Sequence, residues 1–300
     1  MNSAYIASVI NSTLRSTTPI LLAALGCAMC SRVGVFNVAL EAQMLIACFT
    51  SIAVNYFTSS VLLSVLAGVL SGALVGAVVA ILQVKYKAAD MVVGTALNLL
   101  VGAITTFLLY LVFGLRGKLV DNRLVSLSKI NLPVIKDIPF LGRVLENLTI
   151  IDYLSYIIAI VLFVYLFKTV AGFRTLSVGI NKSAAESLGT KATRIQMEMV
   201  TLSGALCGLG GVVLSMGQVT MFTENMTSGR GFIAMAASSL GMSHPLLVIA
   251  SSLFFGLCQG IGLTLQNVVK AQLTNTLPYI ATIVALVLFS KRNSSAKLKK

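Results

Sequence analysis

The stretch VLLSVLAGVLSGALVGAVVAILQV, residues Val61–Val84, decides the fold class because it contains no charged residue. A bilayer has a hydrocarbon core about 30 Å thick, which a helix of about 20 apolar residues crosses. A helix is expected here because it satisfies its own backbone hydrogen bonds in lipid. A charge-free segment of this length is therefore typical of a membrane-spanning helix.

Similar apolar segments recur on both sides of this one. The clear ones are Met91–Gly114, Tyr153–Phe167, Met199–Gly217, Pro245–Leu265 and Thr276–Ser290, and weaker ones are Pro19–Cys30 and Leu40–Tyr56. Gly231–Leu240 is apolar but too short to cross alone. Apolar residues make up 57% of the chain and charged residues 10%, against about 25% charged in soluble domains. We predict an all-α polytopic membrane protein, a single transmembrane domain over residues 1–300 with eight or nine membrane segments.

The basic residues predict the orientation of the chain. Loops that alternate across the predicted spans fall into two groups. Twelve Lys and Arg lie in 85–87, 168–194 and 291–300, and eight lie on the other side, six of them between 116 and 143. Cytoplasmic loops carry an excess of Lys and Arg. We therefore place the 171–196 loop and the basic tail 291–300 in the cytoplasm and the 115–150 loop outside, and leave the side of the N-terminus open. The net charge of +13 follows from these loops, so we expect membrane lipid around the chain and no nucleic acid partner.

Two polar interruptions break the apolar pattern. The first is SRVGVFNVALE, residues 31–41, and the second runs from Gln218 to Arg230 before the short apolar piece. Non-helical backbone at membrane depth is tolerated where it is buried in protein or lines a cavity. Paired interruptions in two halves of a transporter point toward its binding site. They suggest discontinuous helices, an inverted repeat and a transport pathway.

Several polar residues in or near these interruptions are candidates for the pathway. They are Asn37, Glu41, Asn98, Gln218, Glu224, Asn225, Thr227 and Arg230. Glu41 lies within a few residues of strongly apolar sequence, where an ionised carboxylate is costly, so it either lines the path or pairs with Arg32 at the cytoplasmic interface. Asn98 lies mid-span and either bonds a neighbouring helix or faces the path. The cluster from Gln218 to Arg230 also fits an ordinary polar loop.

Other features limit the function. No G-x-x-x-x-G-K-[ST] motif occurs, so we expect neither a P-loop for ATP hydrolysis nor an enzyme. Cys27 and Cys30 form one C-x-x-C without a second pair or a nearby His, and the cysteines are expected to be small buried apolar residues rather than metal ligands. The polar 171–196 segment fits either a solvated loop or a short amphipathic helix, with Ala184, Ala185, Leu188 and Ala192 on one face.

The motifs resemble those of one transporter family. The run TPILLAALG, residues 18–26, followed by RVGVFNVALE, residues 32–41, is similar to the opening of the nucleoside and simple-sugar ABC importer permeases, which are related to branched-chain amino acid and ribose permeases. Residues 222–234 resemble a second signature, and Asn98 matches the pattern. VGINKSAAESLG, residues 178–189, is similar to the cytoplasmic coupling loop, although Ile180 and Ser183 replace its usual Glu and Pro.

The resemblance implies a permease subunit in the cell (inner) membrane. A nucleoside or related small polar solute would be its substrate, with simple sugars or branched-chain amino acids, or a stand-alone secondary transporter, as alternatives. It implies no cofactor in this chain, since partner ATPase chains would bind and hydrolyse ATP. A second permease subunit, identical or different, and an extracytoplasmic substrate-binding lipoprotein would complete the importer. Coupling residues for the ATPase would be Gly179, Asn181, Ala184, Ala185, Glu186 and Gly189.

Overall fold

The computed structural model describes residues 3–130, 144, 146–265 and 280. Within these residues seven helices are long and apolar enough to cross a membrane. They are α1 (Ser3–Arg32), α2 (Leu40–Thr58), α3 (Val61–Ala80) with its π-helical continuation η1 (Ile81–Lys85), α4 (Asp90–Phe113), α6 (Ile150–Lys168), α9 (Ala192–Val212) with the π-helical η3 (Val213–Val219), and α11 (Pro245–Leu265). The predicted all-α polytopic fold is confirmed. The span predicted at Thr276–Ser290 and the tail 291–300 lie outside the described residues.

Short elements connect the long helices. Three short helices are α7 (Val170–Ile180), α8 (Lys182–Ser187) and α10 (Arg230–Leu240). Strand β1 (Lys118–Leu119) pairs antiparallel with β4 (Phe222–Thr223), and β2 (Lys129–Ile130) pairs antiparallel with β3 (Leu148–Thr149). The segment predicted as the outer loop, 115–150, therefore contributes three of these strands. The apolar piece that was too short to span is α10.

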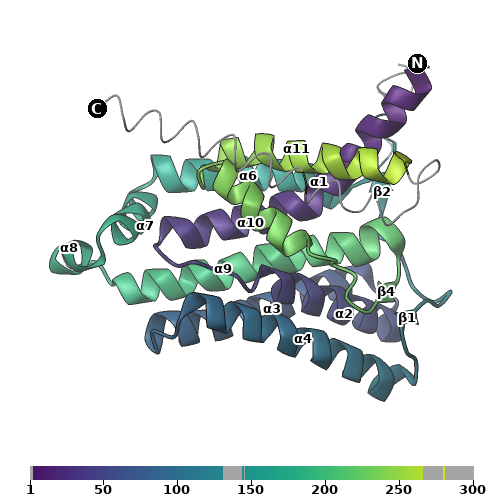
Figure 1. Ribbon diagram of the computed structural model, residues 1–300, viewed down its shortest axis with the longest axis horizontal. Coiled ribbons are helices and arrows are strands. Elements are labelled where there is room, and N and C mark those ends of the chain that lie inside the picture. The colour runs from purple at the N-terminus through teal and green to yellow at the C-terminus, as the bar shows by residue number, and fades with distance from the viewer. Residues whose placement is uncertain (1–2, 131–143, 145, 266–279, 281–300) are drawn as a thin grey trace.

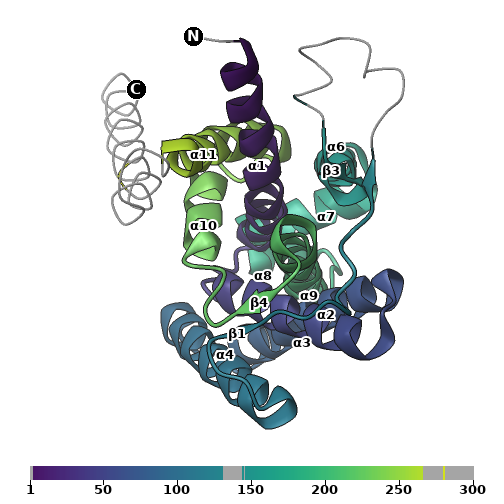
Figure 2. The same cartoon turned by 90° about the vertical axis from the view of Figure 1, so that its right-hand side faces the viewer.

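Helices α1 and α9 form the centre of the molecule. They are the most buried of the long helices, whereas a third or less of the residues in the spans of α3, α4 and α6 are buried. Figure 2 looks along the bundle and shows α2, α3 and α4 on one side of this central pair, with α10 and α11 on another. Leu62, Leu66, Leu70 and Leu74 form an exposed stripe on α3. Such a stripe suits contact with lipid tails.

The contacts among the helices show an inverted repeat. The two most extensive long-range helix pairs are α3 with α9 and α11 with α1, and α2 packs on α9 as α10 packs on α1. The chain runs through α1 and α9 in opposite directions (Figure 1). Exchanging α1–α2–α3 with α9–α10–α11 therefore preserves the contacts. This arrangement is the one expected of the inverted repeat suggested by the two interruptions.

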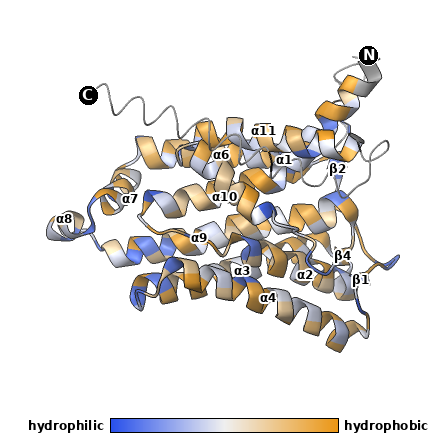
Figure 3. Cartoon of the chain, viewed as in Figure 1, coloured by the Kyte–Doolittle hydropathy of each residue, from blue (hydrophilic) through white to orange (hydrophobic). Residues whose placement is uncertain are grey.

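The two ends of the bundle differ in composition. Figure 3 shows hydrophilic residues near the ends of the helices and at the start of α10, with mostly hydrophobic helix between them. At one end, Asn11 in α1 donates hydrogen bonds of 2.8 Å to the carbonyls of Val144 and Glu146. The start of α1 therefore lies with the 115–150 segment. Helices α7 and α8 lie at the opposite end (Figure 1).

The 171–196 segment differs from the single amphipathic helix that was one of its two interpretations. It contains α7, α8 and the start of α9, separated by Asn181 and by a turn at Gly189, where φ is +80°. Ala185 and Ala192 are buried, but Leu188 is 85% exposed. The four residues do not share one buried face, because the helix ends before Leu188.

Candidate functional site

The two polar interruptions meet inside the bundle. The segment 33–39 leads from α1 into α2, and the segment 220–229 leads from η3 into α10. A Cβ atom added to Gly231 would lie 2.5 Å from the backbone nitrogen of Glu41. The starts of α2 and α10 are therefore in backbone contact. A helix N-terminus carries partial positive charge, and here two such ends face each other.

Glu41 lies between these two helix starts. Its side chain is buried, with 8% exposed, and its two carboxylate oxygens accept hydrogen bonds of 2.7 Å from the backbone N–H groups of Gly229 and Gly231. A carboxylate bound to N–H groups at a helix N-terminus is stabilised by both the hydrogen bonds and the helix dipole. Glu41 therefore joins the two halves of the molecule across their breaks.

The pairing of Glu41 with Arg32, one of the two alternatives, is wrong. Arg32 lies at the far end of α1 and donates to the carbonyls of Ser243 and Met242 at 2.9 and 3.0 Å. Its guanidinium also stacks over the Phe167 ring, 5.5 Å from the centroid.

Two effects lower the pKa of the nearby His244 imidazole below its ordinary value, first its burial and second the positive charge of Arg32. His244 is therefore neutral at pH 7.

Four amide side chains hold the 33–39 segment. Asn98 in α4 donates to the Val38 carbonyl at 3.1 Å and accepts from the Ala42 N–H at 2.9 Å. Asn37 accepts from the Ala39 N–H at 3.0 Å. Gln83 donates to the Phe36 carbonyl at 3.4 Å and Gln196 to the Val33 carbonyl at 2.9 Å. We call Asn37, Gln83, Asn98 and Gln196 the amide clamp. They bond backbone groups that no helix satisfies here, as buried backbone requires.

Asn37 and Asn98 thus have structural partners. The Asn37 amide, 1% exposed, also reaches Gln43 and Ser203 at 3.4 and 3.5 Å. Asn98 bonds the Val38 carbonyl and the Ala42 N–H at the start of α2, as one of its two interpretations expects, while its place in the pathway stays a prediction. Both residues adjoin Glu41 along the chain or through these bonds. The structure therefore brings Asn37, Glu41 and Asn98 together at one break.

Gln218 has a partner that depends on a proline. Pro19 lies inside α1 and has no N–H to donate to the carbonyl of Arg15, four residues earlier. The Gln218 amide donates to that carbonyl at 2.7 Å. A side chain from the opposite half of the molecule therefore replaces the missing helix bond.

Gln218 and Arg230 also line a cavity of about 340 Å³ near the end of the bundle that carries β4. Its polar lining includes Ser12, Arg15, Ser16 and Thr223, and its apolar lining includes Leu214 and Leu263. Arg230 donates to the carbonyls of Met226 and Thr227 at 3.1 and 3.3 Å. This cavity is walled by α1, η3, the 220–229 segment, the start of α10 and α11.

The other candidates of the second interruption lie apart. Glu224 accepts from the Gly117 N–H at 2.8 Å and belongs to the β1–β4 contact. Asn225 is exposed and has a positive φ of 54°. The Thr227 side chain is fully buried, and its hydroxyl has no hydrogen-bond partner within the described part of the chain. The segment therefore does not gather these three side chains at one surface.

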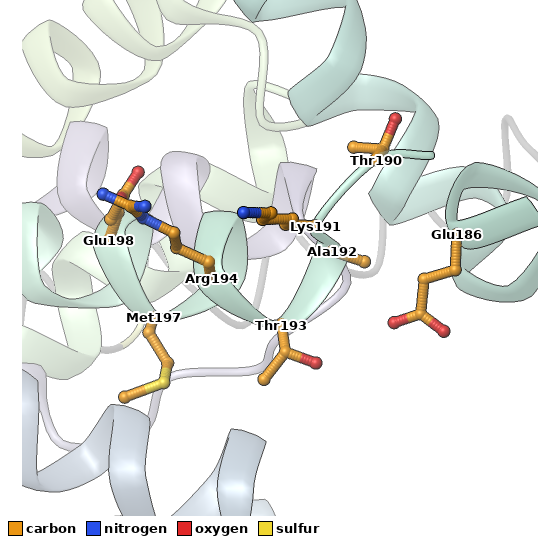
Figure 4. Close-up of a pocket in the computed structure, with 8 residues that line it drawn as sticks. All are labelled: Glu186, Thr190, Lys191, Ala192, Thr193, Arg194, Met197 and Glu198. Carbon is orange, nitrogen blue, oxygen red and sulfur yellow. The ribbon is translucent and has the colours of Figure 1, made fainter. Parts of the chain in front are cut away.

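The predicted coupling residues occupy α7, α8 and their boundaries. Asn181 caps α8 by accepting from the Ala184 N–H at 3.0 Å. Gly179 is packed against the carbonyl of Arg32, where a side chain would not fit. Glu186 is exposed and lines an open hollow of about 620 Å³ with Lys191 and the Arg194–Glu198 ion pair (Figure 4). Ala185 faces inward, whereas Ala184 and Gly189 are exposed.

Sequence reasoning missed Gln83 and Gln196. Each is a polar residue at the margin of an apolar segment, where solvent exposure is the ordinary expectation, yet each is only 7% exposed. The first polar interruption was the available signal that such partners are needed. The residues 33–39, which lie between two helices, need donors and acceptors from elsewhere, and amides near segment ends can supply them.

These features together define a polytopic membrane transport protein. Helices broken at membrane depth, with their starts meeting between inverted halves, are a common transporter device. The chain belongs to the family described as branched-chain amino acid transport system / permease component, whose model matches residues 9–289. It is accordingly a permease-family component of the cell membrane that crosses it several times.

Individual relatives match nearly the whole chain. The chain is 33% identical to the guanosine ABC transporter permease protein NupQ of Bacillus subtilis, over 96% of this chain and 94% of that protein. It is 32% identical to the nucleoside ABC transporter permease protein NupC of Lactococcus lactis, over 94% and 92%. It is 25% identical to the putative glucose ABC transporter permease protein TsgC13 of Haloferax volcanii, over 98% and 95%. No solved structure is similar enough to count as a match.

Proposed function

We propose that the chain is the permease subunit of an ABC importer for nucleosides. The observation that carries this proposal is the similarity to the guanosine and nucleoside permeases along nearly their full lengths. The sequence identity to the putative glucose permease is lower, at 25%. A nucleoside is a neutral, polar ligand with many hydrogen-bonding groups.

The importer would need further chains. A partner ATPase would bind and hydrolyse ATP, a second permease subunit would complete the pathway, and an extracytoplasmic lipoprotein would deliver the nucleoside. The exposed apolar side chains at α7 and α8 support the ATPase contact. Ile180 and Leu188 are 87% and 85% exposed at the end of the molecule away from β1 and β4 (Figure 1). Apolar side chains this exposed outside the spans favour a protein contact.

The proposed mechanism is alternating access around the meeting helix starts. ATP binding on the partner would move α7 and α8, and the two inverted halves would rock about the contact of Glu41 with Gly229 and Gly231. The path would lie near Asn37, Glu41 and Asn98 on one side and the cavity with Gln218 and Arg230 on the other. The 220–229 segment, which carries the partly exposed Glu224, the exposed Asn225 and the buried Thr227, would border its outer end.

Uptake by the reconstituted complex tests the substrate. Proteoliposomes would contain the complex purified with its ATPase, and radiolabelled guanosine would be supplied with the binding protein. We expect ATP-dependent uptake that unlabelled nucleosides suppress and that glucose and leucine do not. Competition by glucose or leucine alone would contradict the nucleoside assignment, and uptake without any ATPase would favour a stand-alone transporter.

A charge placed on the exposed apolar residue that follows α8 tests the ATPase contact. We expect Leu188→Glu to lower the amount of ATPase that co-purifies with the permease by about tenfold, since a buried unpaired carboxylate costs more than about 1.4 kcal/mol. The matched control is Val120→Glu at the opposite end, also an exposed residue. Equal ATPase recovery in the two variants would contradict docking at α8.

A further inference from the structure

The amide clamp is connected to the predicted coupling region through one residue. Gln196, in the first turns of α9, donates to the Val33 carbonyl at 2.9 Å and accepts from the Lys182 ammonium at 2.9 Å. Lys182 is the first residue of α8. Gln196 is 7% exposed and Val33 is fully buried. One buried amide therefore bonds both α8 and the non-helical segment.

A second contact joins the same two regions. Gly179, near the end of α7, is so close to the Arg32 carbonyl that a Cβ would not fit, and that Cβ would lie 3.3 Å from the Gly34 nitrogen. Gly34 has a φ of +74° and makes the turn out of α1. Since this contact is between backbones, a shift of α7 must also shift the start of the 33–39 segment.

The other end of this segment leads to the contact between the halves. Asn98 bonds the Val38 carbonyl in this segment and the Ala42 N–H in the first turn of α2. Glu41 lies in the same turn and binds the start of α10. A continuous series of bonded groups thus runs from Lys182 through Gln196 and the 33–39 segment to Glu41. Tightly packed interiors transmit displacement rather than absorb it.

We infer that Gln196 is a positioning residue for transport, which passes the movement of α8 to the 33–39 segment and so to the Glu41 contact. This inference rests on the proposed function, in which an ATPase moves α8. Gln196 touches neither the cavity with Arg230 nor Glu41 itself. Its two hydrogen bonds make the position of the 33–39 segment depend on the position of Lys182 in α8.

Four single variants test this role in the assembled complex. Gln196→Leu removes both bonds, and Lys182→Met removes the bond to α8 while leaving Gln196 on Val33. Lys182→Arg keeps a cationic donor, and Lys168→Met is the matched control that removes a lysine elsewhere. Recovery of the co-purified ATPase would first establish that each complex assembles.

The first readout is guanosine uptake per ATP hydrolysed. We expect Gln196→Leu and Lys182→Met to lower this ratio by about 2- to 30-fold, the range of measured coupling effects, while ATP hydrolysis continues. Lys182→Arg and Lys168→Met should stay near the original ratio. The double variant Gln196→Leu with Lys182→Met should have the same uptake per ATP as Gln196→Leu alone, since the two residues act in series.

The second readout does not depend on the substrate. We expect ATP to change hydrogen exchange at the amides of residues 33–39 in the unaltered complex, and both Lys182→Met and Gln196→Leu to remove that change. A complex that takes up no nucleoside but shows this ATP response, and loses it in both variants, would contradict nucleosides as the substrate and support the positioning role of Gln196. A Lys182→Met complex that matches Lys168→Met in both readouts would overturn the inference, because Gln196 would then only fasten the segment.

Discussion

Single polar side chains satisfy the backbone groups that the two helix breaks and Pro19 leave without helical bonds. Each of five such side chains bonds at least one backbone group, and they are Glu41, Asn37, Asn98, Gln196 and Gln218. Leaving such a group unpaired costs about 1–3 kcal/mol. Four of the five, all except Gln196, are also candidates for the pathway, so the same side chains fix the shape of the backbone around it.

The carboxylate of Glu41 provides the first prediction. Glu41→Ala should lower the stability of the protein in detergent by about 1–3 kcal/mol, because the buried N–H of Gly231 and the partly buried N–H of Gly229 lose their acceptor. Thermal unfolding would measure the loss. Glu224→Ala is the control, since that partly exposed carboxylate accepts a bond from the exposed Gly117 N–H, and water can replace it. An equal effect of the two changes would contradict the buried contact.

The pair of Gln218 and Pro19 provides a second prediction. Gln218→Leu should destabilise the protein by about 1–3 kcal/mol, since the Arg15 carbonyl loses its donor. In a Pro19→Ala background the same change should cost much less, because the substituted alanine supplies the N–H of an ordinary helix. A double-mutant cycle by thermal unfolding measures the difference. Additive effects would show that Gln218 does not act through this carbonyl.

At the scale of elements, glycine sets how closely the helices approach. A Cβ on Gly72 of α3 would lie 2.5 Å from the Gly204 carbonyl of α9, and on α11 a Cβ at Gly260 would lie 2.8 Å from the Thr13 hydroxyl of α1. Small residues permit this approach, and in lipid close packing replaces the hydrophobic drive that water provides. The two equivalent helix pairs therefore use the same device.

A side chain in this interface should separate the helices. Gly72→Val should destabilise the protein by about 1–3 kcal/mol through overpacking, measured by thermal unfolding in detergent. Gly102→Ala in α4 is the control, since nothing in the described part of the chain lies within 4 Å of the added Cβ. A stable Gly72→Val variant would show that α3 and α9 are less closely packed than the glycine contacts require.

At the scale of the whole molecule, the two ends of the bundle predict the orientation. Asn11 near the start of α1 bonds the carbonyls of Val144 and Glu146, so we expect the N-terminus on the outer side. The α7–α8 region and its basic residues should face the cytoplasm under the positive-inside rule. The structure thus adds the side of the N-terminus, which the charges leave open.

Cysteine labelling in intact cells checks this orientation. A cysteine at Asn122 should react with an impermeant reagent added outside, and cysteines at Ser187 and Lys297 should react only after the membrane is opened. The native Cys27, Cys30, Cys48 and Cys207 are buried and Cys258 is partly exposed, so labelling of the protein without an added cysteine gives the background. Labelling of Ser187→Cys from outside would invert the topology.

The sequence by itself determined the membrane-spanning fold and both breaks. Long charge-free segments need a lipid environment. A polar run such as residues 31–41 interrupts the apolar pattern and is therefore visible in the sequence. The order of motifs also indicated the family, which the match over residues 9–289 bears out. These properties are local, so composition along the chain reveals them.

Only the tertiary structure decided which groups meet. Glu41 and Gly231 are 190 residues apart along the chain, and no local pattern favours Gly231 over Arg32 as the partner of the carboxylate. The same holds for Gln196 with Val33 and for Gln218 with the carbonyl that Pro19 leaves unpaired. Pairing across inverted halves depends on how α1 and α9 pack, and that packing follows from contacts summed over the whole bundle.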